Sequence, residues 1–212
     1  MRLRCKLLEC RYPFLVPLVY LFMPENSAQY ASRAGEKLQF ALTSFSISLN
    51  GLICADFGCS TGGFTDCMLQ NGAAHVYSVD TAYGELAWKL RNDPRVTVLE
   101  RTNAMHVTLP QKVDFLTVDT SWTKQVLVLP NALQNLKEGG TLISLIKPHY
   151  EAPKQYLRKG RLLDEKIEEV LDMVQKDMSK IGLSVKQMVE SPIVGEKGKN
   201  REFLVLWDRS LV

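Results

Sequence analysis

From residue 52 onward, short apolar runs alternate with segments of helical character. The apolar runs are rich in β-branched residues and have the length of strands, at residues 52–57, 74–80, 95–100, 113–119 and 141–147. The segments between them predict helices at residues 62–72, 83–93 and 123–140, two of which end at a glycine. This alternation predicts a parallel sheet with helices on both faces.

The hydrophobic period changes after residue 160. Apolar residues then recur at steps of three and four, which predicts one amphipathic helix over about 164–181. Two further strands are expected at 183–192 and 201–207, joined by the short segment "VGEKGKN", and a connection of this length suits an antiparallel hairpin. The fold expected is α/β and doubly wound, a Rossmann-like, mostly parallel seven-stranded sheet with an antiparallel C-terminal hairpin.

A different pattern precedes this domain. The segment "RYPFLVPLVYLFMP" at 11–24 follows a basic start and is apolar over the length of a signal peptide. It has no A-x-A-like cleavage site, contains Pro13 and Pro17, and is too short to span a bilayer, so no stable membrane insertion is expected. We interpret residues 1–29 as an N-terminal extension, either the remnant of an alternative start or an apolar arm, and residues 30–212 as one domain.

Composition adds little to this interpretation. With 46% hydrophobic and 23% charged residues the chain has ordinary globular values, and a formal net charge of +3 does not by itself indicate a nucleic-acid-binding protein. The basic residues do gather in two places, for which a solvated face is the alternative explanation: Arg2, Arg4, Lys6 and Arg11, and then Lys147, Lys154, Arg158, Lys159, Arg161 and Lys166.

The cysteines indicate the compartment. There are five, none of them in a C-x-x-C pair, so neither a zinc site nor a disulfide framework follows: Cys5, Cys10, Cys54, Cys59 and Cys67. Because Cys54 lies within an apolar run and reads as a small buried residue, a reducing cytoplasm suits the chain best.

The stretch "ICADFGCSTGGFTDCM" at 53–68 joins a predicted strand to a predicted helix through three glycines. No lysine follows as in a P-loop, and the spacing differs from the G-x-G-x-x-G of dinucleotide folds. Asp56 ends the strand and suits a ligand with a positive amino group, and Asp80 ends the next strand where doubly wound folds bind a ribose. S-adenosylmethionine has both groups. The alternatives are a tight turn for the glycines and a capping role for Asp80.

Two further charged residues, Asp119 and Lys147, stand at the predicted ends of the fourth and fifth strands, where a ligand crevice opens in such folds. Pro148 disfavours a helical conformation at Lys147 and keeps it extended at the mouth of the strand. An exposed charge at a strand end is the alternative for each of the two.

Longer stretches carry a resemblance to a known family. They are "YASRAGEKL" at 30–38, "DFGCSTGGFTDCML" at 56–69, "VDTAYGELAWKLRNDPRVTVLERTNA" at 79–104, "LIKPHYE" at 145–151 and "GKNREFL" at 198–204. In register over about 30–208, they resemble the hemolysin A (TlyA) family of FtsJ-like ribosomal RNA 2′-O-methyltransferases. The resemblance implies a methyltransferase fold, S-adenosylmethionine as cofactor, and ribosomal RNA or ribosomal subunits as partner, with the basic segment 154–166 holding RNA backbone.

The resemblance also implies a catalytic tetrad, which by motif falls on Lys37, Asp119, Lys147 and Glu202. A lysine with an unperturbed pKa near 10.4 is mostly protonated at neutral pH, but burial and a second lysine nearby can lower that pKa. We therefore expect Lys147 to act as the base, while the other three orient it and the ribose.

For the cofactor, the resemblance places Asp80 on the ribose, Asn103 near the adenine, and six residues of the glycine-rich turn around the methionine portion: Gly58, Ser60, Thr61, Gly62, Gly63 and Phe64. The alternative for Asn103 is a loop residue that caps a helix.

Departures from the family pattern leave two other functions open. Residues 1–29 do not resemble the S4 RNA-binding domain that family members usually carry, Ala34 replaces a glycine of the "SRGG" motif, and the usual "DVSF" is "DTSW" here. The chain could instead be a cofactor-binding module that needs a partner or an S4 domain for turnover. The third alternative is a hemolysin-like membrane-active protein, which would have to insert the apolar N-terminal segment.

Overall fold

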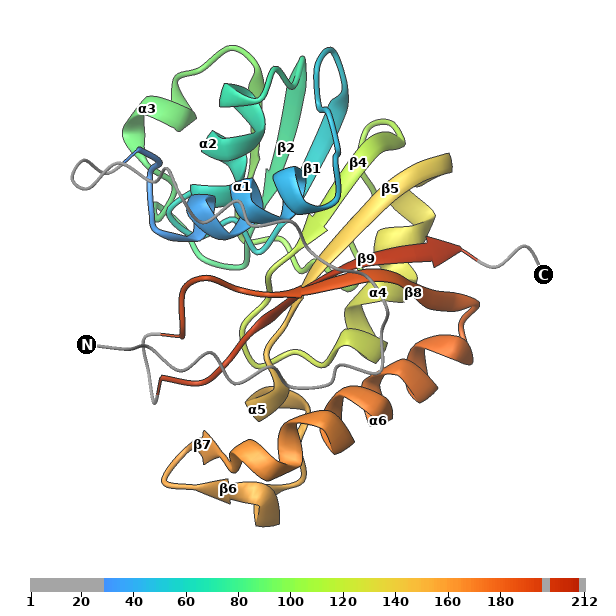
Figure 1. Ribbon diagram of the computed structural model, residues 1–212. Helices are drawn as coiled ribbons and strands as arrows, with labels where there is room; N and C mark the ends of the chain where they lie inside the picture. Colours follow the sequence, from blue (N-terminus) through green and yellow to red (C-terminus); the bar gives the residue numbers. More distant parts are fainter. Residues whose placement is uncertain (1–28, 196–198, 210–212) are drawn as a thin grey trace, which may run out of the picture.

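The computed structural model describes residues 29–195 and 199–209, so residues 1–28 of the predicted N-terminal extension lie outside the described residues. A seven-stranded sheet forms the centre of the molecule, in the order β3-β2-β1-β4-β5-β9-β8 (Figure 1). The strands are β1 Ile53–Phe57, β2 His75–Val79, β3 Val96–Leu99, β4 Val113–Val118, β5 Leu136–Ile146, β8 Leu183–Glu190 and β9 Phe203–Arg209.

The first five strands pair in parallel, and β9 runs antiparallel to both β5 and β8. The predicted sheet with its C-terminal hairpin is therefore confirmed. Chain order reverses beside β1, since β2 lies on one side of it and β4 on the other. This is the place where open α/β sheets form a ligand crevice beyond the carboxyl ends of their strands.

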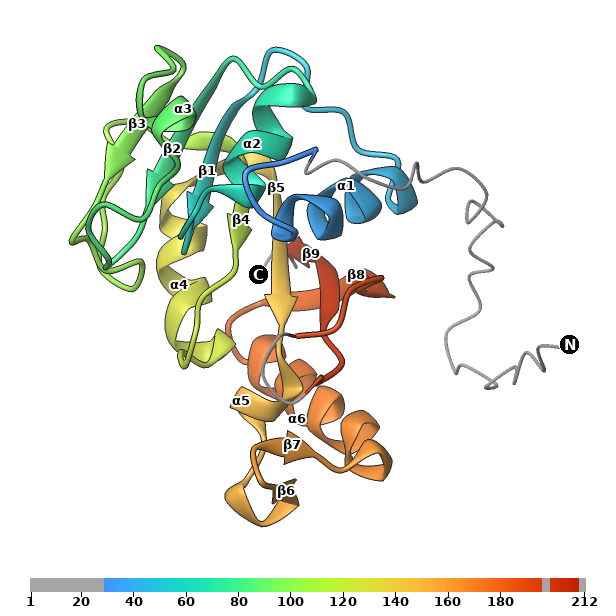
Figure 2. The ribbon, with the colours of Figure 1, turned by 90° about the vertical axis from the view of Figure 1, so that its left-hand side faces the viewer.

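Helices cover both faces of the sheet, as its buried strands require. On one face lie α1 Ala34–Ser44, α2 Gly63–Gln70 and α3 Trp88–Arg91, and on the other lie α4 Gln125–Asn135 and α6 Ile167–Ser179 (Figures 1 and 2). Each face has its own apolar core: Leu38 and Met68 belong to the first, and Leu129 and Val170 to the second.

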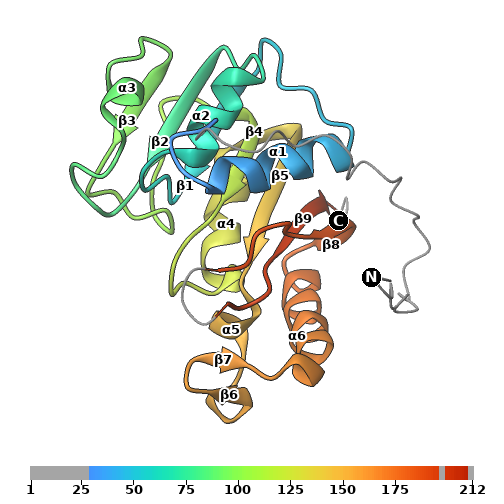
Figure 3. The ribbon, with the colours of Figure 1, turned by 60° about the vertical axis from the view of Figure 1, so that its left-hand side comes forward.

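A small projecting unit connects β5 to α6. It contains α5 Pro148–Glu151, a 3-10 turn at Lys154–Tyr156, the two-stranded hairpin of β6 Leu157–Arg158 and β7 Arg161–Leu162, and a second 3-10 turn at Asp164–Lys166. In all three ribbon views the hairpin lies away from the main sheet, near the N-terminal end of α6, the helix that follows it in the chain (Figures 1, 2 and 3).

Two predicted helices are shorter than expected. The helix predicted at 123–140 ends at Asn135, because Leu136 already pairs with Val113 as the beginning of β5. The helix predicted at 83–93 is reduced to the single turn Trp88–Arg91. Its first part is a loop held by side chains at the ends of β2 and β3: Asp80 accepts from the N–H of Ala82, and Glu100 accepts from the N–H of Gly84.

Among the described residues, no helix combines the length and the apolar character needed to cross a membrane.

Candidate active site

The glycine-rich turn connects three strands at the crevice. Gly58 follows β1 with a φ of 90°, which L side chains rarely adopt, and its N–H donates to the carbonyl of Val79 at the end of β2 over 2.8 Å. A Cβ on Gly58 would collide with the backbone carbonyl of Asp119, which follows β4. The glycine therefore allows the ends of β1, β2 and β4 to meet, and it leaves backbone exposed to a ligand.

The other two glycines of the turn have a packing role, contrary to the expectation that they contact the cofactor. Gly62, with a φ of 96°, faces the side chains of Leu86 and Leu90, and Gly63 faces Ser32 and the backbone of Gly35. Neither lines the cavity described below. Because these two glycines have no side chain, α2 packs closely against α1 and against the segment that includes α3, and this packing fixes the position of the glycine-rich turn.

Asp56 is also buried behind the turn, so the structure gives no support to its predicted contact with an amino group. Its side chain is 0% exposed and does not line the cavity. Its carboxyl group accepts from the N–H and the hydroxyl of Thr65 at 2.9 and 2.8 Å, and from the hydroxyl of Thr117 at 3.1 Å. Burial raises the pKa of Asp56 to about 7, so the group ties α2 to the sheet rather than presenting a fixed charge to a ligand.

A cavity of about 860 Å³ opens at the carboxyl ends of the parallel strands. Of the residues predicted to hold the cofactor, the structure brings six to its wall: Gly58, Ser60, Thr61, Phe64, Asp80 and Asn103. All four predicted tetrad members line the same cavity: Lys37, Asp119, Lys147 and Glu202. The volume lies within the usual range for small-molecule sites, roughly 300–1,000 Å³.

Asp80 and Asn103 each combine a cavity position with a structural contact. The carboxylate of Asp80 accepts from the N–H groups of Ser60 and Ala82, both at 2.8 Å, and the side chain of Asn103 accepts from the N–H of Met105 at 2.9 Å. The contacts to Ala82 and Met105 stabilise local turns, and no helix begins at either residue, so the helix-capping alternative for Asn103 does not apply. A carboxylate oxygen can accept more than one hydrogen bond, so Asp80 keeps acceptor capacity on the side that faces the cavity.

The tetrad forms two ion pairs. Lys37 Nζ, from α1, lies 2.6 Å from Glu202 Oε2, just before β9, and Lys147 Nζ, at the end of β5, lies 2.5 Å from Asp119 Oδ1. The four side chains are between 4% and 16% exposed, which protects both pairs from screening by solvent. Lys147 has the extended backbone that its following proline predicts.

The expected lowering of the pKa of Lys147 does not occur. Burial lowers that pKa, but the Asp119 carboxylate beside it and the charge of Glu202 outweigh burial, and on balance the pKa is raised. The second lysine has no such lowering effect because Glu202 neutralises Lys37. Lys147 therefore holds its proton at neutral pH in this structure, and its predicted role as the base needs revision.

Aromatic residues at the cavity were not predicted. Trp122 is 78% exposed, its ring lies 4.7 Å from that of Tyr150, and the Tyr150 ring lies 4.1 Å from that of His149, all distances between ring centroids. All three line the cavity. The sequence signal was their position beside the motif residues Asp119 and Lys147. Burial, together with the charge of Lys147, lowers the pKa of His149 to about 4, so its imidazole is neutral at pH 7.

The cavity suits S-adenosylmethionine. Backbone at Gly58 and the acceptor Asp80 line a cavity large enough for this cofactor, and within the described residues the hydroxyl of Thr120 on the cavity wall is buried without a hydrogen-bond partner. A polar ligand would satisfy that hydroxyl. The residues that would hold the nucleoside and the methionine portion are those following β1 and β2.

Comparison with known proteins identifies the family of the chain. The FtsJ-like methyltransferase family matches residues 30–209. A Bacillus subtilis protein named "Putative rRNA methyltransferase YqxC" is 41% identical over 186 residues, covering 85% of this chain and 66% of that protein. The "16S/23S rRNA (cytidine-2'-O)-methyltransferase TlyA" of Mycobacterium tuberculosis is 36% identical over 188 residues, covering 86% of this chain and 70% of that protein.

Among solved structures, "Putative hemolysin from Streptococcus thermophilus" is similar with a TM-score of 0.83 at 38% identity, covering 88% of this chain and 70% of that one. Fold, cavity and comparisons together define a methyltransferase domain whose cofactor is S-adenosylmethionine. The chain belongs to the FtsJ-like methyltransferase family. It spans about two thirds of the length of the curated relatives given above.

Proposed function

We propose that this chain methylates a ribose 2′-hydroxyl of ribosomal RNA. The observation that carries the proposal is the pairing of Lys37 with Glu202 and of Lys147 with Asp119 in one cavity, beside the residues that would hold the cofactor. Two curated relatives of this chain are named as ribosomal RNA methyltransferases, and the name of one states 2′-O-methylation of cytidine.

Positioning is the main task of these side chains. A hydroxyl is a weak nucleophile, and its oxygen must be aligned with the methyl carbon at roughly 3 Å before reaction. Bound S-adenosylmethionine supplies a methyl group on a positively charged sulfur, so that an oxygen–carbon bond forms as the sulfur–carbon bond breaks. The ammonium of Lys147 would donate a hydrogen bond to the attacking oxygen and fix its lone pairs.

Asp119 is the group that would accept the proton. As the new bond forms, the attacking oxygen becomes positively charged and strongly acidic, so a carboxylate is a sufficient base. Lys147 keeps that carboxylate in place at 2.5 Å, and Lys37 with Glu202 forms the second ion pair of the cavity wall. This assignment exchanges the roles of Lys147 and Asp119 relative to the sequence expectation, because the pKa of Lys147 is raised.

The test is methyl transfer to ribosomal RNA and to intact ribosomal subunits from cells that lack the protein, using labelled cofactor and the Lys147→Met variant. We expect label from the wild-type chain, a loss of at least about 100-fold for the variant, and cofactor affinity by calorimetry within about threefold of wild type. Mass mapping should place the label on a ribose. Absence of label on both forms of RNA with the wild-type chain would overturn the proposal.

A further inference from the structure

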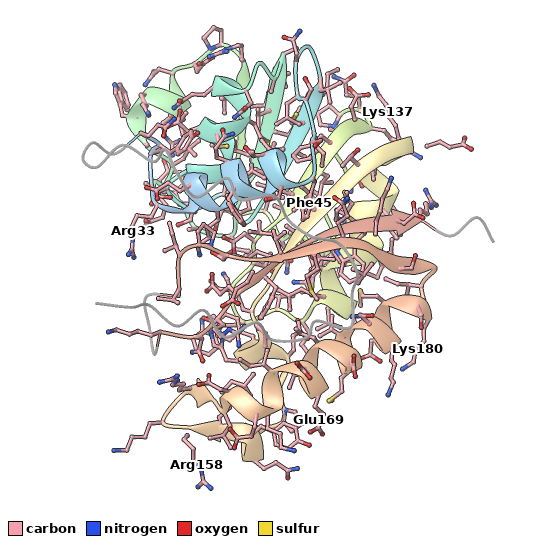
Figure 4. The ribbon with its side chains drawn as sticks, viewed as in Figure 1. Arg33, Phe45, Lys137, Arg158, Glu169 and Lys180 are labelled. Atoms are coloured by element: carbon pink, nitrogen blue, oxygen red, sulfur yellow. The ribbon has the colours of Figure 1, made fainter. Side chains whose placement is uncertain are left out.

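The two-stranded hairpin of β6 and β7 presents a compact basic tip. Its strands are joined by Lys159 and Gly160, whose φ angles of 49° and 79° are those of a two-residue type I′ turn. Arg158 and Lys159 are exposed there, and within the described residues neither forms an ion pair, whereas Arg161 pairs with Asp164. Figure 4 shows Arg158 directed away from the molecule.

A buried asparagine attaches this hairpin to the cavity. Asn200 is 4% exposed, its Oδ1 accepts from the N–H of Leu162 at 3.0 Å, and its Nδ2 donates to the carbonyl of Gly160 at 3.1 Å. Its own carbonyl accepts from the N–H of Gly195 at 3.0 Å, and Gly195 lines the cavity. One side chain thus holds the turn of the hairpin and its second strand.

Asn200 stands two residues before Glu202 in the chain, and Glu202 enters β9 through a backbone contact with Ser191 at 2.8 Å. The other end of the hairpin unit begins at Pro148, directly after Lys147. The basic tip is therefore connected to one member of each ion pair, to Lys147 along the chain and to Glu202 through Asn200.

We propose that the hairpin tip binds the phosphate backbone of the RNA and that Asn200 is a positioning residue that fixes this contact relative to Glu202. The inference rests on the proposed function. Phosphate contacts by Lys and Arg set the register of a protein on a nucleic acid, and here the register determines which ribose reaches Lys147. A displacement of 1 Å at a reacting group can reduce the rate about 100-fold, so a rigid link between tip and cavity has a kinetic effect.

The tip is tested with the double variant Arg158→Ala with Lys159→Ala, and with Lys180→Ala as a matched control. Lys180 is an exposed lysine at the opposite end of α6 (Figure 4) and is 71% exposed. Binding of ribosomal RNA and subunits is measured against salt in the presence of S-adenosylhomocysteine. Loss of two phosphate contacts should reduce the slope of log K against log salt by about 1.4 to 1.8, and Lys180→Ala should leave it unchanged.

Asn200→Ala is compared with Asn135→Ala. Asn135 is a buried asparagine at the end of α4 whose side chain also bonds backbone N–H and carbonyl groups. Asn135 is 5% exposed, accepts from the N–H of Leu109 at 2.8 Å and donates to the carbonyl of Val107 at 3.0 Å. Both variants should lower Tm, but only Asn200→Ala should lower kcat on RNA, by about tenfold or more, without changing cofactor affinity or the salt slope. In a double-mutant cycle, the tip substitutions should reduce kcat/KM less in Asn200→Ala than in wild type.

The outcomes separate this inference from the proposed function. If the wild-type chain methylates RNA but the tip substitutions leave the salt slope unchanged, or if the two asparagine variants reduce turnover equally, the inference is overturned while the function stands. If the wild-type chain transfers no methyl group to RNA, the proposed function fails, and the salt slopes still decide whether the tip binds phosphate.

Discussion

At the scale of single residues, the charge of Lys147 depends on Asp119, whose Oδ1 lies 2.5 Å from Nζ. Burial opposes the ammonium, and the two carboxylates nearby, Asp119 and Glu202, restore it. A motif can place a lysine in a site, but only the neighbours in space decide whether that lysine carries a proton. This explains why the sequence motifs lead to four residues that share one cavity, whereas the structure favours a different base from the one expected.

The rate of methyl transfer should consequently be independent of pH between about pH 7 and 9. Lys147 keeps its proton throughout this range because its pKa is raised, and the step we propose does not require it to lose that proton. Single-turnover measurements on RNA follow methyl transfer without product release. A rise of about tenfold per pH unit would instead show that Lys147 must deprotonate, and Asp119→Asn should then move that rise to lower pH.

Asp56 should make stability depend on pH. Its pKa is about 7 in the folded protein and about 3.9 in an unfolded chain, so the folded state binds the additional proton between these values and stability falls as pH rises through that window. Between pH 5 and 8 we expect wild type to lose about 2 kcal/mol of unfolding free energy relative to Asp56→Asn. Urea unfolding at both pH values measures this. Parallel pH profiles for the two proteins would contradict it.

At the scale of elements, the turn between β1 and α2 sets the shape of the cavity through Gly58. We expect Gly58→Ala to lower kcat by at least about tenfold, because the added Cβ would push the backbone of Asp119. The positive φ at this position adds backbone strain of about 1–2 kcal/mol for any residue with a Cβ. Gly84→Ala is the control, since Gly84 also has a positive φ, of 79°, but no atom within 4 Å of an added Cβ. Comparable loss of turnover in both variants would rule out the contact with Asp119.

The elements that periodicity predicts are those whose apolar residues face a core. The five parallel strands and α6 follow from local pattern, because the apolar residues of each pack against one of the two cores. The beginning of β5 and the loss of helix before Trp88 do not follow, since they depend on pairing with Val113 and on side chains such as Glu100. The basic hairpin escapes local reasoning because Asn200, 38 residues away from Leu162, holds it.

In the candidate site, too, some residues could be predicted from local sequence and others depend on contacts with distant residues. Residues at strand ends, such as Asp80 and Asp119, could be predicted because parallel strands bring their carboxyl ends to one edge. The burial of Asp56 could not be predicted, because a carboxylate at a strand end points either into the crevice or under the helix, and one residue of register separates the two directions.

At the scale of the whole molecule, Lys37 and Glu202 connect α1 to the start of β9 across 165 residues of sequence. Lys37→Met should lower the free energy of unfolding by about 3 kcal/mol, because Glu202, 4% exposed, would keep a buried charge without this partner. Adding Glu202→Gln should restore most of the stability and none of the activity. Equal stability of the single and double variants by chemical denaturation would show that the pair does not contribute in this way.

The order of strands at the end of the sheet also has a consequence for synthesis. β8 leaves the ribosome before β9, yet in the finished sheet β9 lies between β5 and β8, and among the described strands β8 pairs with β9 alone. The nascent chain can therefore complete the residues following β1 and β2 while β8 still waits for its partner. Of the four residues in the two ion pairs, Glu202 is therefore the last to be synthesised, and Lys37 acquires its partner only after β9 has been made.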